Sequence, residues 1–190
     1  MDVRISHRRI GVLFPLPVVS LDLMIAAYEG PYRDAFLQLL RMSPAPYSRT
    51  QFDPGHITAS CYVIDSDRRL LLHHHRRLNR WLQMGGHLEA GEQPVDAALR
   101  EAAEESGLRD LELAFDGIVD LDVHVIPAGR GEPEHRHFDV RYIAQTASPD
   151  SIAMDAQESN ELMWVDLDRA AELMSGDESL RVIRKIGRLR

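Results

Sequence analysis

The spacing of apolar residues along the chain predicts several strands. Two runs, residues 57–64 and 70–75, are rich in Ile, Val, Leu and Tyr and are separated by a polar turn, which predicts a β-hairpin. Further strands are predicted within residues 111–126, 137–146 and 161–167. Around the second of these, polar and apolar residues alternate, which is typical of a strand with one polar and one apolar face.

Helical spacing predicts four short helices and a longer one. The longer helix covers residues 93–106, because Pro94 is tolerated in a first turn and Gly107 is a typical C-terminal stop. Its core-facing stripe is predicted to contain three apolar residues, Val95, Leu99 and Ala102, with the glutamates of the helix pointing away from the core. The short helices are predicted at residues 20–30, 32–42, 168–174 and 178–190.

This order of elements indicates a layered domain. Strands that surround a central helix, with more helices near the end of the chain, are typical of an α/β or α+β fold. We expect a helical extension at residues 1–50 and one globular domain at residues 51–190. The two helices of the extension are interpreted as a hairpin that serves as a dimerisation arm or as a lid, so a homodimer is one expectation.

Composition excludes several classes of protein. Hydrophobic residues make up 44% and charged residues 27% of the chain, which is ordinary for a globular protein. The formal net charge of −8 argues against a nucleic-acid surface, which needs Lys and Arg to offset phosphate charge. No apolar run approaches the ~18 residues that span a bilayer, so no membrane partner is expected. Cys61 is the only cysteine in the sequence, which excludes an intramolecular disulfide and fits a reducing, cytoplasmic setting.

Three glutamates crowd one flank of the predicted helix at 93–106. Glu101, Glu104 and Glu105 are spaced i, i+3 and i+4, so their carboxylates are neighbours and repel one another. Carboxylate oxygens are hard ligands that suit Mg²⁺ or Mn²⁺, and a divalent cation would offset this repulsion. The ordinary alternative for such a cluster is a solvated acidic helix face.

The segment from Gly86 to Leu108 resembles the signature box of the Nudix hydrolase superfamily. Gly86 is followed after five residues by Glu92 and after seven more by Arg100, and the segment then reads Glu101-Ala102-x-Glu104-Glu105-x-Gly107-Leu108. The resemblance implies an α/β/α sandwich around a mixed β-sheet and a divalent-metal-dependent pyrophosphohydrolase. Many members of the superfamily have proline where this chain has Met84. This difference concerns the positioning of the substrate and leaves the metal ligands unchanged.

The resemblance also implies roles for individual residues. Glu101 and Glu105 match the principal metal ligands and Glu104 a further one, and the backbone carbonyl of Gly85 matches a position that often completes the coordination shell. Glu101 and Arg100 are expected to act in catalysis, with Arg100 also holding a carboxylate by bidentate hydrogen bonds. The residues implied to stabilise the box are Gly86, Glu92 and Gly107.

A loop acid ahead of the last predicted strand supplies a further ligand or the general base in several members of the superfamily. Glu158 is our first candidate for this role and Glu161 the second. For either carboxylate, a solvated loop position is the ordinary alternative.

Histidines supply a second group of candidates. His135, His137, Asp139 and Arg141 alternate along one predicted strand, so their side chains share a face that either holds a second metal or phosphate oxygens or faces solvent. His124 is a further candidate for this cluster, but we interpret it as a core histidine whose hydrogen bonds are satisfied. Residues 73–75 are three consecutive histidines, but neighbours on a strand point to opposite faces and cannot converge on one ion.

Taken together, the sequence predicts a pyrophosphohydrolase that cleaves a nucleoside diphosphate linked to another moiety. Its partner is expected to be a small nucleotide substrate and its cofactor Mg²⁺ or Mn²⁺. Two alternatives remain open at this point: a module of the same fold that binds a nucleotide metabolite without turnover, and a purely structural metal site. The sequence predicts no particular substrate.

Overall fold

The structure is a computed structural model that describes residues 20–129, 131–155, 157, 159–174 and 176–189. Its helices are α1 (Leu21–Ala27), α2 (Arg33–Met42), α3 (Pro94–Ser106), α4 (Leu167–Leu173) and α5 (Asp177–Ile186), with a 3₁₀ turn at Pro149–Ser151. Its strands are β1 (Gly55–Ile64), β2 (Leu70–His75), β3 (Arg80–Leu82), β4 (Met84–His87), β5 (Glu112–Leu113), β6 (Asp120–Ile126), β7 (His135–Gln145) and β8 (Ser159–Val165). Every predicted helix and strand is present. The strands β3 and β4 lie between the predicted hairpin and the predicted helix at 93–106, where no strand is predicted.

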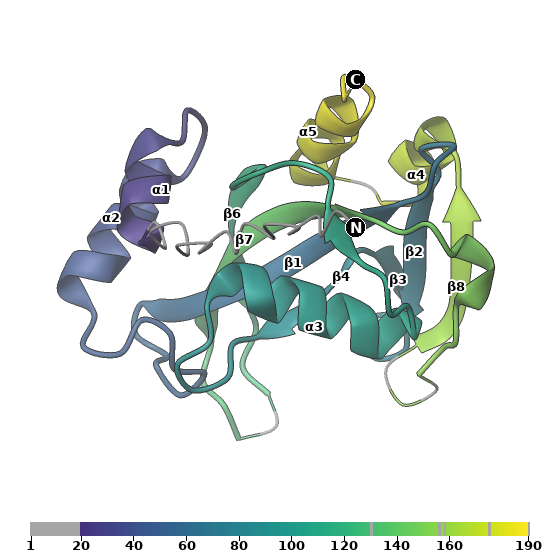
Figure 1. Ribbon diagram of the computed structural model, residues 1–190. Helices are drawn as coiled ribbons and strands as arrows, with labels where there is room; N and C mark the ends of the chain where they lie inside the picture. The colour runs from purple at the N-terminus through teal and green to yellow at the C-terminus, as the bar shows by residue number, and fades with distance from the viewer. Residues whose placement is uncertain (1–19, 130, 156, 158, 175, 190) are drawn as a thin grey trace, which may run out of the picture.

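Strand β1 lies at the centre of a mixed sheet (Figure 1). It pairs antiparallel with β2 and β4, and it pairs parallel with β7 along its whole length. Strands β5 and β6 extend the sheet beyond β7, while β3 and β8 pair with β2. The register Val63↔Leu71 confirms the predicted hairpin, and the β1–β7 pairing adds a long-range partner to it.

One face of the sheet packs against α3, α1 and α2. Alternate residues of β1, from Ile57 to Val63, enter this core together with alternate residues of β7, from Phe138 to Ala144. Phe36 of α2 contacts Phe138 edge-on, with ring centroids 5.4 Å apart. The helical extension therefore shares a hydrophobic core with the sheet.

The opposite face is covered in part by α4 and α5, which lie on the far side of the sheet from α3 in Figure 1. Tyr62 of β1 and Ile143 of β7 pack there against apolar residues of α5. The structure thus has two helical layers around a mixed sheet, and it confirms the predicted α/β/α sandwich.

The basic C-terminal helix α5 is held to the sheet by charge as well as by apolar contact. Arg181 and Lys185 donate hydrogen bonds to the buried carboxylate of Asp120, at 3.0 Å and 3.2 Å. The apolar face of α5, which includes Val182 and Ile186, is fully buried. In the part of the chain that the structure describes, no helix combines the length and the apolar character needed to cross a membrane.

The predicted stripe Val95, Leu99 and Ala102 does pack in or against the core, but the prediction that the glutamates point away from the core is wrong for Glu105. Ala97, Ala98 and Ala102 are completely buried, whereas Val95 and Leu99 are only partly buried. The buried face is therefore turned toward the glutamates, and Glu105 is only 7% exposed. Alanine side chains are short, so the helix lies close to the sheet on this side, which the larger Val and Leu side chains would prevent.

Candidate functional site

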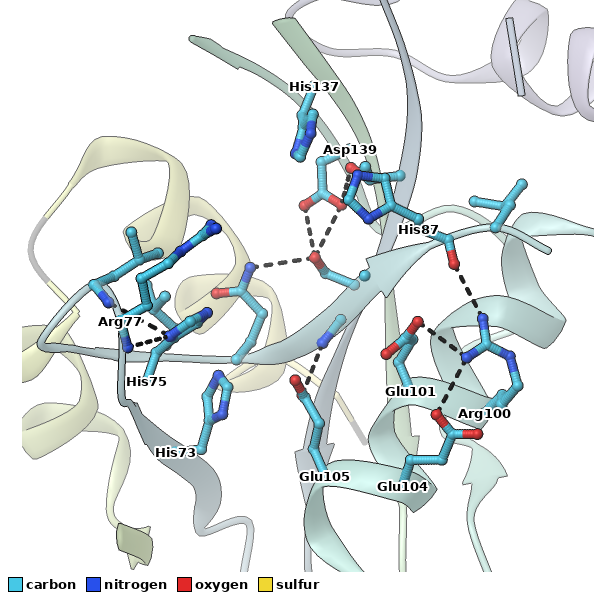
Figure 2. A pocket seen from close by; sticks show the side chains of 18 of the residues that line it. His73, His75, Arg77, His87, Arg100, Glu101, Glu104, Glu105, His137 and Asp139 are labelled. Carbon is cyan, nitrogen blue, oxygen red and sulfur yellow. Dashed lines mark hydrogen bonds and ion pairs between the residues drawn. The ribbon is translucent and has the colours of Figure 1, made fainter. Parts of the chain in front are cut away.

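Helices α4 and α5 cover only part of the sheet face opposite α3. The uncovered part of this face borders a cavity of about 1240 Å³. Polar residues of β1 and β7, such as Ser60 and His137, line it, together with β2, β4, β6, α3 and the loop before α3. Figure 2 shows Glu101, Glu104 and Glu105 on one side of this cavity. Histidines and Asp139 approach from the sheet.

Two glycines in β4 let α3 approach the sheet edge. The backbone N–H of Gly85 donates to a carboxylate oxygen of Glu105 at 3.1 Å. A Cβ on Gly86 would lie 2.6 Å from the carboxylate carbon of Glu101. Both glutamates are therefore packed against the β4 backbone, and a side chain at position 86 would displace one of them.

Arg100 connects α3 to the loop before it. Its guanidinium donates to both carboxylate oxygens of Glu92, at 2.9 Å and 3.0 Å, and to the backbone carbonyl of His87 at 3.0 Å. It also donates to Glu101 at 3.0 Å and to Glu104 at 3.3 Å. The hydrogen bond with Arg100 lowers the pKa of Glu92, and that with Glu92 raises the pKa of Arg100. This fork–fork geometry fixes the planes of both groups.

The three glutamates differ in exposure. The side chain of Glu104 is 61% exposed and that of Glu101 is 19% exposed, while Glu105 as a whole is only 7% exposed. Burial raises the pKa of Glu101, although its hydrogen bond with Arg100 acts in the opposite direction. A nearby cation would offset this penalty on the charged form. The carboxylate donor set, crowded and partly desolvated, therefore fits a hard divalent ion.

Asp139 lines the cavity and belongs, together with Arg141, to a buried polar network. Asp139 accepts hydrogen bonds from Thr58 at 3.1 Å and from Ser60 at 2.8 Å, and Arg141 donates to it at 3.0 Å. Arg141 also donates to Asp122 at 3.0 Å. Because Asp139 and Arg141 are 2% and 4% exposed, the polar face of β7 is not a solvent-facing surface.

The histidines of β7 lie next to other histidines. The Nε2 atoms of His135 and His137 are 3.3 Å apart. The ring of His137 also lies within about 5 Å of the rings of His56 and His87, at 4.8 Å and 5.0 Å between centroids. Sequence reasoning missed His56 and His87 as partners, because neither stands near His137 in the chain. His124 is oriented by Asp122, which lies 3.0 Å from its Nδ1.

The consecutive histidines 73–75 do not converge, as predicted. His73 and His75 lie on one side of β2 with ring centroids 5.5 Å apart, and His74 contacts Trp81. Burial lowers the pKa of His73 to about 4, and its Nδ1 lies 2.8 Å from the hydroxyl oxygen of Ser159.

A family model for the NUDIX domain matches residues 54–185. The chain belongs to the NUDIX domain family. This confirms the resemblance of residues 86–108, and the match covers every element from β1 to most of α5. The helices α1 and α2 precede the matched NUDIX residues.

Curated relatives match part of the chain. The m7GpppN-mRNA hydrolase NUDT17 of Xenopus laevis is 31% identical over 108 residues, which are 53% of this chain and 36% of that protein. A probable DHNTP pyrophosphohydrolase of Lactococcus lactis is 31% identical over 91 residues, which are 47% of this chain and 53% of that protein. The chain thus spans about a third to a half of the length of these relatives.

Solved structures share the fold. An Ap4A hydrolase of C. elegans in a binary complex superposes with a TM-score of 0.56 and 20% identity, covering 69% of this chain and 94% of that chain. A hydrolase of the NUDIX family from Clostridium perfringens has a TM-score of 0.53 and 28% identity, covering 71% of this chain and 98% of that chain. These superpositions confirm the fold class.

Of the two predicted loop acids, the structure describes only Glu161. Glu158 lies outside the described residues, so its role stays a prediction. Glu161 is exposed on β8. Gly107 ends α3 with a φ of 76°, a left-handed conformation that favours glycine.

Proposed function

We propose that this chain is a divalent-metal-dependent pyrophosphohydrolase that cleaves a nucleoside diphosphate linked to another moiety, or a related nucleotide. The observation that supports this most is the packing of Glu101 and Glu105 against β4 at the edge of a large cavity, with Arg100 holding Glu101 and Glu92 in place. The relatives named above are hydrolases or pyrophosphohydrolases, which favours the same class of reaction.

We assign Mg²⁺ or Mn²⁺ to the carboxylates of Glu101, Glu104 and Glu105, with the carbonyl of Gly85 as a further ligand. When bound, such an ion neutralises diphosphate oxygens and makes the phosphorus more electrophilic. The donor set supports this choice because carboxylate and carbonyl oxygens are the ligands that these hard cations prefer.

Glu101 is the proton acceptor in this proposal. A carboxylate oxygen of Glu101 that does not hold the metal can accept a proton from the attacking water. Arg100 holds the Glu101 carboxylate in one orientation through the 3.0 Å hydrogen bond, which keeps the acceptor oxygen aimed. Glu158, which directly precedes β8 in the sequence, is the alternative proton acceptor.

The cavity supports a small anionic substrate. Although the net charge of the chain is −8, the cavity lining includes Arg49, Arg76 and Arg77, whose guanidinium groups attract phosphate oxygens. A nucleic-acid polymer is not expected, because phosphate tracking needs a wider basic surface. The single cysteine, Cys61, is buried within the core, which agrees with the proposed cytoplasmic setting.

The test is a screen of purified protein against nucleoside diphosphate derivatives, with Mg²⁺ and with Mn²⁺, in which the phosphate-containing products are identified. Glu101→Gln and Glu105→Gln are each expected to lower kcat by about 10²-fold or more while the melting temperature is kept. The matched control is Glu112→Gln, which changes an exposed carboxylate on β5 and should keep full activity.

Two results would contradict the proposal. Unchanged turnover in both active-site variants would remove the glutamates from the reaction. Tight Mg²⁺-dependent nucleotide binding by the wild-type protein, with no product after long incubation, would instead support a binding module of the same fold.

A further inference from the structure

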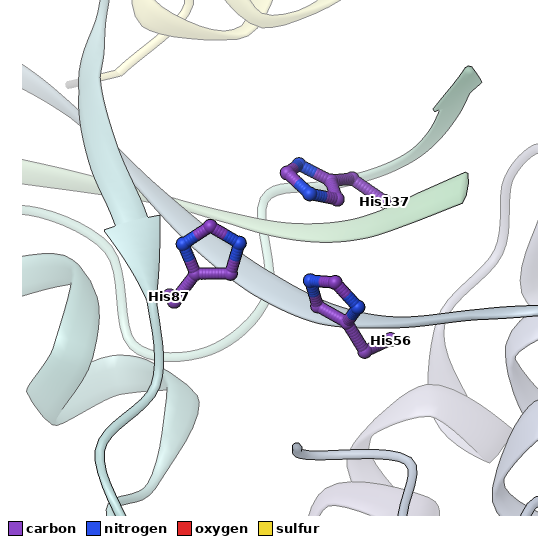
Figure 3. Close-up of side chains that lie close together, drawn as sticks. All are labelled: His56, His87 and His137. Atoms are coloured by element: carbon purple, nitrogen blue, oxygen red, sulfur yellow. The ribbon is translucent and has the colours of Figure 1, made fainter. Parts of the chain in front are cut away.

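Three histidines from three neighbouring strands meet beside the carboxylate site (Figure 3). His56 on β1 pairs in parallel register with His137 on β7, and His87 ends β4, where it pairs with Thr58 of β1. The ring centroids form a nearly equilateral triangle, with separations of 4.8, 5.0 and 5.1 Å. One nitrogen from each ring lies within 4.8 Å of the other two. We call His56, His87 and His137 the histidine triangle.

A hydrogen bond to a backbone carbonyl orients the ring of His56 and fixes its tautomer. Its Nδ1 lies 3.0 Å from the carbonyl oxygen of Gln51, which can only accept, so Nδ1 carries the ring proton and Nε2 keeps its lone pair. The residue is 1% exposed, and within the described chain its Nε2 has no hydrogen-bond partner. Burying such a nitrogen without a partner is unfavourable. A second nitrogen oriented by a carbonyl is the usual arrangement of a metal-ligating histidine.

Burial favours the neutral form of all three rings. Burial lowers the pKa of His56, that of His87 to about 4 and that of His137 to about 2. Neutral imidazole is the form that binds metal ions, so burial acts in the same direction as the geometry of the three rings.

We propose that the histidine triangle binds a transition metal ion of the Zn²⁺ class, with a fourth coordination position open to the cavity. His87 and His137 line the cavity, whereas His56 lies behind them. Three histidine ligands with one open position are typical of zinc sites that bind water or substrate. Imidazole favours zinc-like ions and carboxylate favours Mg²⁺ or Mn²⁺, so the two neighbouring sites select different metals.

Binding a tetrahedral metal ion requires the three ligand nitrogens to move closer together. Ligands of a tetrahedral zinc ion lie about 3.3 Å apart, given Zn–N bonds of about 2.0–2.1 Å. The widest pair in the histidine triangle, at up to 4.8 Å, must therefore close by about 1.5 Å, which rotation about the soft χ2 torsions of histidine can supply. His137 exchanges its contact with His135, at 3.3 Å, for the metal.

The test measures metal binding directly. Protein freed of metal by chelation is titrated with Zn²⁺ by calorimetry in excess Mg²⁺, which keeps the carboxylate site occupied, and Co²⁺ is added separately to record its visible spectrum. We expect one equivalent of Zn²⁺ and the intense absorption of four-coordinate Co²⁺. His87→Gln and His137→Gln are each expected to weaken binding by about 100-fold or more and to remove that absorption.

The matched control is His124→Gln. Its ring lies 5.5 Å from that of His137 but is paired with Asp122, so Zn²⁺ affinity should be kept. Should His137→Gln fail to fold, as judged by circular dichroism, the partly exposed His87 decides the question. The proposal is overturned by no Zn²⁺ uptake in the wild type, or by uptake that persists in His87→Gln. It is equally overturned if uptake is lost only in a Glu101→Gln, Glu105→Gln double variant, which would place Zn²⁺ at the carboxylates. The readout does not use turnover, so it stands apart from the proposed hydrolase activity.

Discussion

Gly86→Ala is expected to displace the carboxylate of Glu101 without destabilising the fold. A Cβ at position 86 would meet the carboxylate of Glu101 and no backbone atom among its three nearest neighbours. The backbone of Gly86 does not lie in the left-handed region, so alanine fits its dihedral angles. The only group that has to move is the far end of a flexible glutamate.

The size of that movement follows from the contact distances. The added Cβ would lie 2.6 Å from the carboxylate carbon and Oε1 of Glu101 and 2.9 Å from its Oε2. Carbon atoms in comfortable contact are about 3.5 Å apart, so the carboxylate must retreat by about 0.9 Å. A misplacement of about 1 Å costs roughly 10²-fold in rate. Weakening the partly exposed pair with Arg100 costs only about 0–1 kcal/mol.

The assay compares kcat and melting temperature with those of Gly187→Ala. At Gly187 the nearest atom to an added Cβ is 3.7 Å away, which is ordinary contact, so this control should keep both quantities. We expect Gly86→Ala to lose about 10²-fold in kcat with a shift in melting temperature of only a few degrees. Full kcat at an unchanged melting temperature would refute the reasoning, because Glu101 would then tolerate displacement. A collapse of stability would refute it too, since the clash would then fall on the fold.

Three further outcomes follow from the packing. Phe36→Ala should lower the free energy of unfolding by about 3–5 kcal/mol in a denaturant titration, because it empties a fully buried site against Phe138; a loss below 1 kcal/mol would show that α2 is not part of the core. Asp120→Asn should cost about 3–5 kcal/mol by the same measurement, because buried and partly buried cations would lose their carboxylate. Burial lowers the pKa of His73 from about 6.5 in the unfolded chain to about 4, so the folded state should lose stability as pH falls between these values. That loss amounts to about 1.4 kcal/mol per pH unit, and His73→Gln should show a slope shallower by that amount.

The acidic site could be predicted from the sequence because its geometry is local. Glu101, Glu104 and Glu105 lie on one helix, so their spacing brings their side chains together, whereas the pairing of Glu92 with Arg100 was implied only by the resemblance of residues 86–108 to the Nudix box. The prediction of the buried helix face was less successful. That prediction chose Val95 and Leu99 because they are large and apolar. The approach of α3 to the sheet instead depends on alanines in the helix and on glycines in a short strand that the sequence does not predict.

The histidine triangle could not be predicted in the same way. His56 and His137 meet because β1 and β7 pair in parallel, and this register brings together residues far apart in the chain. A one-residue shift in that register would turn one of the two rings to the other face of the sheet. The alternation along β7 did predict that His137 and Asp139 share a face. It could not predict that Thr58, Ser60 and Arg141 take up the oxygens of Asp139.

The short strand β4 links the two candidate metal sites through three consecutive residues. The N–H of Gly85 donates a hydrogen bond to Glu105, and Gly86 leaves room for the Glu101 carboxylate. The carbonyl of His87 accepts a hydrogen bond from Arg100, and its ring belongs to the histidine triangle. Residues i and i+2 of a strand share a face, so Gly85 and His87 are oriented together by the same pairing with β1. The position of this strand therefore sets the distance between a carboxylate site suited to hard cations and an imidazole site suited to zinc-like ions. That distance determines whether one substrate in the cavity can reach both.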